Sequence, residues 1–231
     1  TLEEFTAAAR QKRKELESFT VLDVRDAEHK AALLREADDA MARVKLGCDL
    51  LVGARLLGLK PAEQETLLSQ LLWDYVAGLP MDGYNAQRAL NATRKERAFH
   101  WPFEFPEVFA SEERSGFSAF VGNPPFIGGK RIRETLGDRY REGLNSFFIG
   151  SEGGADYCTF FFLKCFQLIS NNGILGLIAT NTIAQGDTRS TGLDKIIEHG
   201  GTIYLANNNF PWPGNAGVVI NIIHIFKGAF H

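Results

Sequence analysis

The chain lacks several features that would place it outside the cytoplasm. No apolar run reaches the roughly 18 residues that a membrane-spanning helix requires, and the amino-terminal region lacks the pattern of a secretory signal. There are only three cysteines, an odd number without paired spacing, so no disulfide scaffold is predicted. No C-x-x-C pair or histidine cluster indicates a metal site. We therefore expect a cytoplasmic protein with reduced thiols and no bound metal.

An excess of positive charge is also missing. The 231 residues carry 25 Lys and Arg against 28 Asp and Glu, a formal net charge of -3. A dedicated nucleic-acid module is usually basic, so any contact with nucleic acid would have to use a local patch. Hydrophobic residues make up 45% of the chain, enough for a buried core. Because the first residue is Thr rather than Met, we expect a piece of a longer protein.

Residues 1–98 are predicted to form a helical region. Apolar residues recur at helical spacing from Ala27 to about Leu57, and Asp26 is placed to cap that helix. Pro61 suits the first turn of a second helix, which Gly78 and Pro80 would end. A third helix is expected from Tyr84 to about Arg97. We interpret the region as an insertion or a brace beside the second domain, residues 99–231.

The remainder alternates between strands and helices. Four apolar runs are predicted as strands, and they cover residues 117–121, 173–179, 202–206 and 217–226. Helices are expected over residues 157–169 and 193–199. This alternation is typical of an α/β fold with parallel strands and crossover helices. The last strand follows a proline-rich loop with little room for a helix, so we expect it to pair antiparallel.

The sharpest chemical signal is the sequence Gly122-Asn123-Pro124-Pro125-Phe126, directly after the first predicted strand. Ligands of open α/β sheets bind beyond the carboxyl ends of strands. The Asn123 side-chain oxygen and the Pro124 carbonyl would accept the two N–H groups of an exocyclic amine. That arrangement would aim the nitrogen lone pair at an electrophilic methyl group. The prolines stiffen the backbone, and Phe126 offers a face on which a base can stack.

These residues resemble a known family. Asn123–Phe126 is similar to the N-P-P-[FY] motif of amino-methyltransferases that use S-adenosylmethionine, and the neighbouring segments resemble the methylase region of MmeI-like type II restriction–modification enzymes. The segments that carry the resemblance are His100–Phe109, Ala155–Tyr157, Asn172-Gly173, Gly176–Ile183, Gly192–Asp194 and Gly200–Ile203. The resemblance covers roughly residues 98–228.

The resemblance implies a DNA adenine-N6 methyltransferase, active in restriction–modification or phage defence, with double-stranded DNA as its partner. The implied fold is the C-terminal half of a Rossmann-like class I S-adenosylmethionine-dependent methyltransferase sheet, preceded by a helical segment. The target adenine would be flipped out of the duplex. The catalytic group would be Asn123, Pro124, Pro125 and Phe126, with S-adenosylmethionine as methyl donor.

Further positions follow from the same resemblance. Asp156 and Tyr157 would border the donor, although Asp156 is as readily interpreted as a helix N-cap. Phe210 or Trp212 would supply a second aromatic wall for the base, or would pack on the core. A basic cluster beside the motif would contact a DNA phosphate, unless it is an ordinary solvated face; it comprises Lys130, Arg131 and Arg133. Thr180-Asn181-Thr182 would lie at the same sheet edge as Asn123.

The glycine-rich turn that holds the donor in this fold is not found before Asn123. Gly53 lies within a helical pattern, and the glycines of residues 150–154 follow the motif instead of preceding it. We therefore expect a fragment that binds S-adenosylmethionine weakly or not at all and is inactive alone. The first predicted strand would have an open edge. The fragment would self-associate or cover that edge with its helical segment, and its partners would be the remaining parts of the parent polypeptide.

Two other interpretations remain open. The N-P-P-[FY] motif also occurs in enzymes that methylate guanine N2 of ribosomal RNA or glutamine side chains of proteins, although the helical region and the MmeI-like segments disfavour both. Alternatively, the chain is a non-catalytic interaction module whose helices dock a partner subunit. An intact N-P-P-F element disfavours that interpretation as a complete account. The sequence leaves open the DNA site that is recognised and whether a nuclease is linked.

Overall fold

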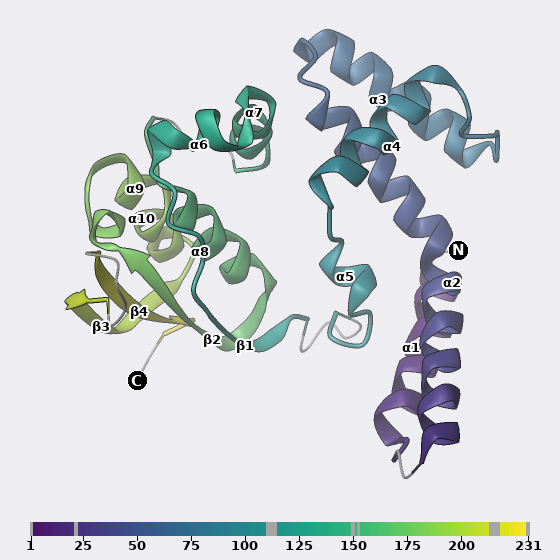
Figure 1. Cartoon of the computed structure of the whole chain (residues 1–231), viewed down its shortest axis with the longest axis horizontal. Helices are drawn as coiled ribbons and strands as arrows, with labels where there is room; N and C mark the ends of the chain where they lie inside the picture. Colours follow the sequence, from purple (N-terminus) through teal and green to yellow (C-terminus); the bar gives the residue numbers. More distant parts are fainter. Residues whose placement is uncertain are drawn as a thin grey trace. The chain divides into compact units, whose positions relative to one another are not determined.

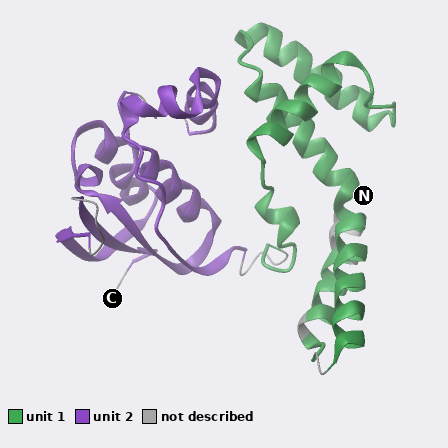
Figure 2. Cartoon of the chain, in the orientation of Figure 1, with its two compact units in different colours: residues 1–113 green, residues 114–231 purple. Residues whose placement is uncertain are grey.

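The computed structural model describes residues 2–20, 23–109, 115–148, 151, 153–212 and 218–229. It divides into two compact units, Thr1–Glu113 and Arg114–His231 (Figure 2). The sequence suggests a boundary after residue 98, whereas the units divide after Glu113. The reason is local packing, because Lys45 donates to Glu104 at 2.9 Å and Phe103 packs against Met41 and Val44.

The first unit is helical (Figure 1). Its helices are α1 (Leu2–Ser18), α2 (Val24–Leu56), α3 (Pro61–Val76), α4 (Tyr84–Glu96) and the short α5 (Trp101–Glu104). The core between α2, α3 and α4 includes Leu50, Leu71 and Ala89. Gly53 lies inside α2, as expected. A Cβ atom there would lie 2.0 Å from the Ala89 carbonyl oxygen, so glycine is what allows α2 and α4 to approach so closely.

The start of α2 differs from the prediction. The N-cap is Asp23 rather than Asp26, and the helix begins three residues earlier, at Val24. The Asp23 carboxylate accepts from the Asp26 N–H at 2.9 Å, and the Asp26 carboxylate accepts from the Asp23 N–H at 3.2 Å. Asp26 therefore completes a reciprocal capping box instead of providing the cap itself.

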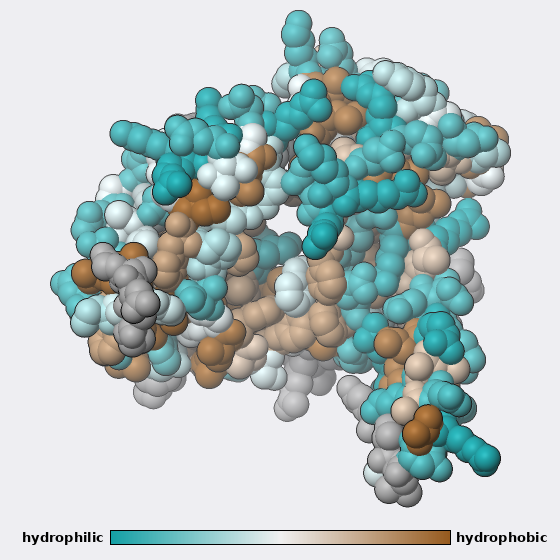
Figure 3. Space-filling view, in the orientation of Figure 1, coloured by the Kyte–Doolittle hydropathy of each residue, from teal (hydrophilic) through white to brown (hydrophobic). Residues whose placement is uncertain are grey.

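The visible surface of this unit is mostly hydrophilic, with smaller hydrophobic areas between (Figure 3).

The second unit is a mixed α/β structure. Its strands are β1 (Phe117–Gly122), β2 (Ile169–Thr180), β3 (Gly201–Pro211) and β4 (Val219–Lys227). Its helices are α6 (Gly129–Leu136), α7 (Asp138–Phe147), α8 (Tyr157–Leu168), η1 (Asn181–Ala184), α9 (Gly186–Thr191) and α10 (Leu193–Glu198). The strands form one sheet in the order β1-β2-β4-β3. β1 and β2 are parallel, while β4 runs antiparallel to both β2 and β3, so the predicted antiparallel last strand is confirmed.

Two strands are longer than the apolar runs that predict them. β2 begins at Ile169, ahead of the predicted run. Its pairing with β1 shifts register between Phe117 and Ala119, and in this part of β2 the backbone of Asn172 lies in the left-handed region at φ 64°. β3 continues through its asparagines to Pro211, with Asn209 at φ 57°. The Asn221 side chain, only 3% exposed, accepts from the Asn209 N–H at 2.9 Å. Asparagine tolerates this backbone conformation better than most residues, which keeps both strands continuous.

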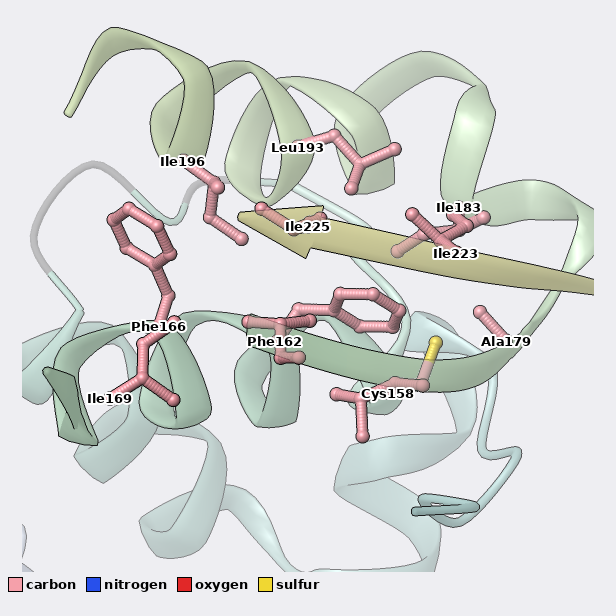
Figure 4. Packing of buried hydrophobic residues seen from close by; sticks show 12 residues of the cluster. Cys158, Phe162, Phe166, Ile169, Ala179, Ile183, Leu193, Ile196, Ile223 and Ile225 are labelled. Atoms are coloured by element: carbon pink, nitrogen blue, oxygen red, sulfur yellow. The ribbon is translucent and has the colours of Figure 1, made fainter. Parts of the chain in front are cut away.

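The core of the second unit lies between one face of the sheet and the helices α8 and α10. Figure 4 shows Phe162 and Phe166 of α8 gathered with side chains of β2, β4 and α10. On β2, Leu175, Leu177 and Ala179 are buried, whereas the alternating residues are partly or fully exposed. The sheet is therefore covered closely on one face and less completely on the other. The Lys227 ammonium caps the carboxyl end of α8, because it donates to the Phe166 and Ile169 carbonyls at 3.0 and 2.8 Å.

The outer edge of β1 has no strand partner among the described residues. β1 pairs only with β2, and Val121 is 90% exposed. An unpaired edge presents free N–H and C=O groups that can pair with another chain. We expect the isolated chain to self-associate as its concentration rises, measured by light scattering after size-exclusion chromatography across a wide dilution series. A Val121→Lys variant should shift the equilibrium towards monomer, and a monomer at every concentration would contradict the expectation.

Candidate active site at the carboxyl end of the sheet

The N-P-P-F segment leaves the sheet where β1 ends. The parallel register pairs Gly122 with Leu177, and the chain then passes into an irregular loop from Asn123 to Gly128. Proline has no N–H to donate to a ladder, so two consecutive prolines end the pairing there. Because β1 and β2 are parallel, their carboxyl ends meet at the same edge. Thr180 and Thr182 therefore lie at the edge where Asn123 emerges.

The two acceptors of the segment are available for a ligand. Asn123 is exposed, and its side chain forms no hydrogen bond with any described residue. The Pro124 ring is buried, which holds the backbone at this point. Within the described part of the chain, nothing donates to the Pro124 carbonyl, whereas the Pro125 carbonyl accepts from the Ile127 N–H at 3.2 Å. The loop is thus anchored while its Asn123 and Pro124 oxygens remain unused.

One of the two candidate aromatic residues meets Phe126. The rings of Phe126 and Trp212 lie 6.4 Å apart, centroid to centroid, and are perpendicular to each other. The backbone N–H of Trp212 donates to the Val218 carbonyl at 2.9 Å, so Trp212 lies at the base of the loop between β3 and β4. Phe210 belongs to β3 rather than to that loop, pairs with Ile220 and is 49% exposed. Pro213, Gly214 and Asn215 of the same predicted loop lie outside the described residues.

Asp156 occupies the N-cap position of α8, but its side chain does not cap that helix. One carboxylate oxygen, Oδ1, accepts from the Gly129 N–H at 2.9 Å. The other, Oδ2, accepts from the Thr180 hydroxyl at 3.3 Å and also from the Thr182 hydroxyl. The carboxylate is therefore directed at the N-P-P-F loop and at the end of β2.

Tyr157 contacts the same loop through its backbone. Its N–H donates to the Ile127 carbonyl at 2.8 Å, and its hydroxyl lies 2.6 Å from the hydroxyl of Tyr140 on α7. The ring also meets Tyr140 and Phe161 edge-on, with centroids 6.0 and 5.2 Å apart. Tyr157 thus connects the loop, α7 and α8.

Arg141 is a supporting residue that no sequence pattern predicts. It is only 4% exposed, and its guanidinium donates to the Gly153 carbonyl at 2.6 Å and lies over the Phe160 ring at 5.4 Å. Burial, with a smaller contribution from Arg133, lowers the pKa of the Arg141 guanidinium. From the other side, the Asp187 carboxylate accepts from the Gly154 N–H at 2.8 Å. The turn before α8 is therefore fixed by two charged side chains.

The basic cluster lies on α6, directly after the loop. Lys130, Arg131 and Arg133 are all exposed. Arg133 is 3.9 Å from the Asp138 carboxylate, a solvated contact of small energy. The exposure of the cluster is compatible with a solvated face as well as with the predicted phosphate contact.

Cys158 is a free thiol buried beside the site, where its surroundings disfavour the thiolate. Burial, reinforced by the nearby Asp156 charge, raises the pKa of the Cys158 thiol to about 11. Burial likewise raises the pKa of the Cys165 thiol to about 11. Because the thiolate is the reactive form, burial lowers the expected reactivity of both thiols.

Every element described ahead of β1 is a helix, so no strand followed by a glycine turn precedes the N-P-P-F loop. No group of three His, Cys, Asp or Glu side chains in the described ranges could hold a metal ion. None of the helices described is long and apolar enough to cross a membrane.

Comparison with known proteins identifies a family and a structural relative. The model of the Eco57I restriction-modification methylase family matches residues 60–204. The Type IIL restriction-modification enzyme MmeI, solved in complex with DNA, is 25% identical with a TM-score of 0.41, over 48% of this chain and 16% of that one. The chain thus spans about a sixth of MmeI. No curated protein matches. Since the family model covers more than half of the sequence, the chain belongs to the Eco57I restriction-modification methylase family.

Proposed function

We propose that the chain is the catalytic-loop half of a DNA adenine-N6 methyltransferase that takes its methyl group from S-adenosylmethionine. The observation that carries the proposal is the pair of unused acceptors at Asn123 and Pro124, at the carboxyl end of β1. Membership of a restriction-modification methylase family supports DNA as the substrate. The four strands would be the second half of a Rossmann-like methyltransferase sheet, with the antiparallel β4 inserted between β2 and β3.

The chemistry assigned to the loop is the orientation of an amine. An exocyclic amine has two N–H groups, and the Asn123 oxygen and the Pro124 carbonyl would accept one each. The nitrogen lone pair would then point away from both acceptors, towards the methyl group to be transferred. Pre-arranged groups of this kind lower the barrier because the reacting atoms need little further ordering.

The aromatic pair supports a flipped base as the substrate. A base extruded from the duplex loses its stacking, and an aromatic face can replace part of that energy at about 1–3 kcal/mol. Phe126 is half-buried and meets Trp212 at a right angle, so the two rings form a corner. We assign the stacking face to Phe126 and the adjoining wall to Trp212, with Phe210 farther along β3. Lys130, Arg131 and Arg133 are assigned to a nearby phosphate.

The donor is assigned to a site completed by other parts of a parent polypeptide. Tyr157 would border it from this side, at the start of α8, with Asp156 next to it on the side of the loop. We expect this chain alone to bind S-adenosylmethionine more weakly than about 1 mM, corresponding to less than about 4 kcal/mol. Isothermal titration calorimetry measures this directly. Binding in the micromolar range would mean that the described residues already hold a donor site, and would contradict the assignment.

The function is tested on the parent protein with labelled S-adenosylmethionine. Duplex DNA, ribosomal RNA and protein are offered separately, and the products are digested to nucleosides or amino acids. Label in N6-methyladenine from DNA is the expected result. Label in N4-methylcytosine, in RNA or in glutamine would move the same chemistry to another substrate. No label on any substrate would overturn the proposal and favour the interaction module.

A further inference from the structure

We propose that Asp156 is a positioning residue, whose carboxylate holds the downstream end of the N-P-P-F loop against the carboxyl end of β2. The proposal rests on the proposed function, because it concerns how the same loop is kept in place. It gives Asp156 a role in the loop rather than in direct contact with the donor.

The carboxylate oxygens bind two segments that are far apart in sequence. Oδ1 takes the Gly129 N–H at 2.9 Å, and Oδ2 takes the hydroxyls of Thr180 and Thr182. Gly129 is the first residue of α6, so its N–H has no partner within that helix. The α6 N-cap is Gly128, which has no side chain to satisfy it. Asp156 therefore caps α6 from a position 27 residues later in the chain.

Asp156 is itself fixed before it holds the loop. Its N–H donates to the Thr188 hydroxyl of α9 at 3.2 Å, and the following N–H, of Tyr157, donates to the Ile127 carbonyl at 2.8 Å. Gly129 lies directly against the same segment, since a Cβ atom there would be 1.8 Å from the Gly154 carbonyl oxygen. Gly129 is thus required for the close packing of this segment against the loop.

The loop is therefore tied to β2 at both ends. Upstream, Gly122 is paired with Leu177 in the sheet. Downstream, Asp156 joins Gly129 to Thr180, the last residue of β2, and to Thr182 of η1. Between these ties lie Asn123 and Pro124, whose spacing decides whether both can hold one amine. A carboxylate has about four lone-pair positions, and donors of the chain already engage at least two of them. These are the Gly129 N–H and a threonine hydroxyl, since the two threonine hydroxyls also lie 2.7 Å from each other.

The first test uses hydrogen exchange on this chain. In Asp156→Ala the amides of residues 127–131 should exchange about tenfold faster, the change expected from losing one charge-assisted hydrogen bond. Asp156→Asn keeps an oxygen for the Gly129 N–H and an NH₂ group that can donate to a threonine hydroxyl, so it should restore protection. Asp194→Ala, an exposed carboxylate paired with Arg189 on the same unit, is the matched control. Unchanged exchange in Asp156→Ala would overturn the proposal.

The second test measures turnover in the parent methyltransferase. Asp156→Ala should lower kcat by about 100-fold through misplacement of the acceptors, while the Kd for S-adenosylmethionine stays within a small factor of wild type. Asp156→Asn should recover most of kcat. If Asn fails as badly as Ala, or if donor affinity falls in parallel with kcat, Asp156 acts on the donor and the proposal is wrong.

The two tests separate the inference from the function on which it rests. A wild-type parent protein that methylates nothing would refute the proposed function. Hydrogen exchange alone would then decide whether Asp156 holds the loop. Faster exchange together with normal turnover would refute the positioning role. If Asp156→Ala does not fold, Thr182→Val removes one donor to Oδ2 and leaves the Gly129 bond. It should give intermediate changes in both measurements, and the absence of any change would again overturn the proposal.

Discussion

Replacing Asn123 with alanine should lower the methylation rate of the parent protein by about 100- to 1,000-fold, the loss typical when one pre-arranged hydrogen-bonding group is removed from a reacting centre. The Asn123 side chain is exposed and makes no hydrogen bond within the described chain, so its loss should leave stability unchanged. The defect should appear in kcat, with the Kd for DNA little altered. Single-turnover transfer of labelled methyl groups to DNA measures it.

The matched control is Asn171→Ala. Asn171 is also an exposed asparagine of the second unit, but it lies near the start of β2, away from the carboxyl end of the strand. Its replacement should leave the rate of methyl transfer near that of wild type. Equal rates in wild type and Asn123→Ala would remove the main support for the proposed function, because the amide would then have no part in the reaction.

Replacing Phe162 with alanine should cost about 3–5 kcal/mol of the free energy of unfolding of the second unit. Phe162 is fully buried and is among the largest side chains of the core cluster on the sheet (Figure 4). The truncation would leave a cavity between α8, β2 and β4. Hydrogen exchange of the β2 and β4 amides reports on this unit separately from the helical one.

Phe161→Ala is the matched comparison, one residue away on the same helix. Phe161 is half-buried and meets Tyr157 edge-on, so its loss should cost less than about 2 kcal/mol. The sequence presents Phe160, Phe161 and Phe162 as equivalent. Equal destabilisation by the two variants would mean that the core is not organised around Phe162.

Much of the secondary structure could be predicted from local patterns. The helices beginning at Pro61, Tyr84, Tyr157 and Leu193 start as expected, because capping positions and apolar spacing are local properties. The sequence patterns predict where the strands lie but not where each strand begins and ends. β3 runs on through three asparagines, which resemble a loop in the sequence, because the buried Asn221 satisfies a backbone group that a loop would leave to water. Partners distant in sequence decide such boundaries.

The sequence by itself determined that an N-P-P-F segment follows a strand, and therefore which residue types stand at the carboxyl end of the sheet. Only the tertiary structure decided which side chains meet there. It brought Trp212 rather than Phe210 to Phe126, and it directed Asp156 to Gly129 and two threonines instead of to its own helix. The physical reason is that hydrogen bonds and ring contacts depend on distance in space. The pairing of β1 with β2, and of β4 with both of its neighbours, sets those distances.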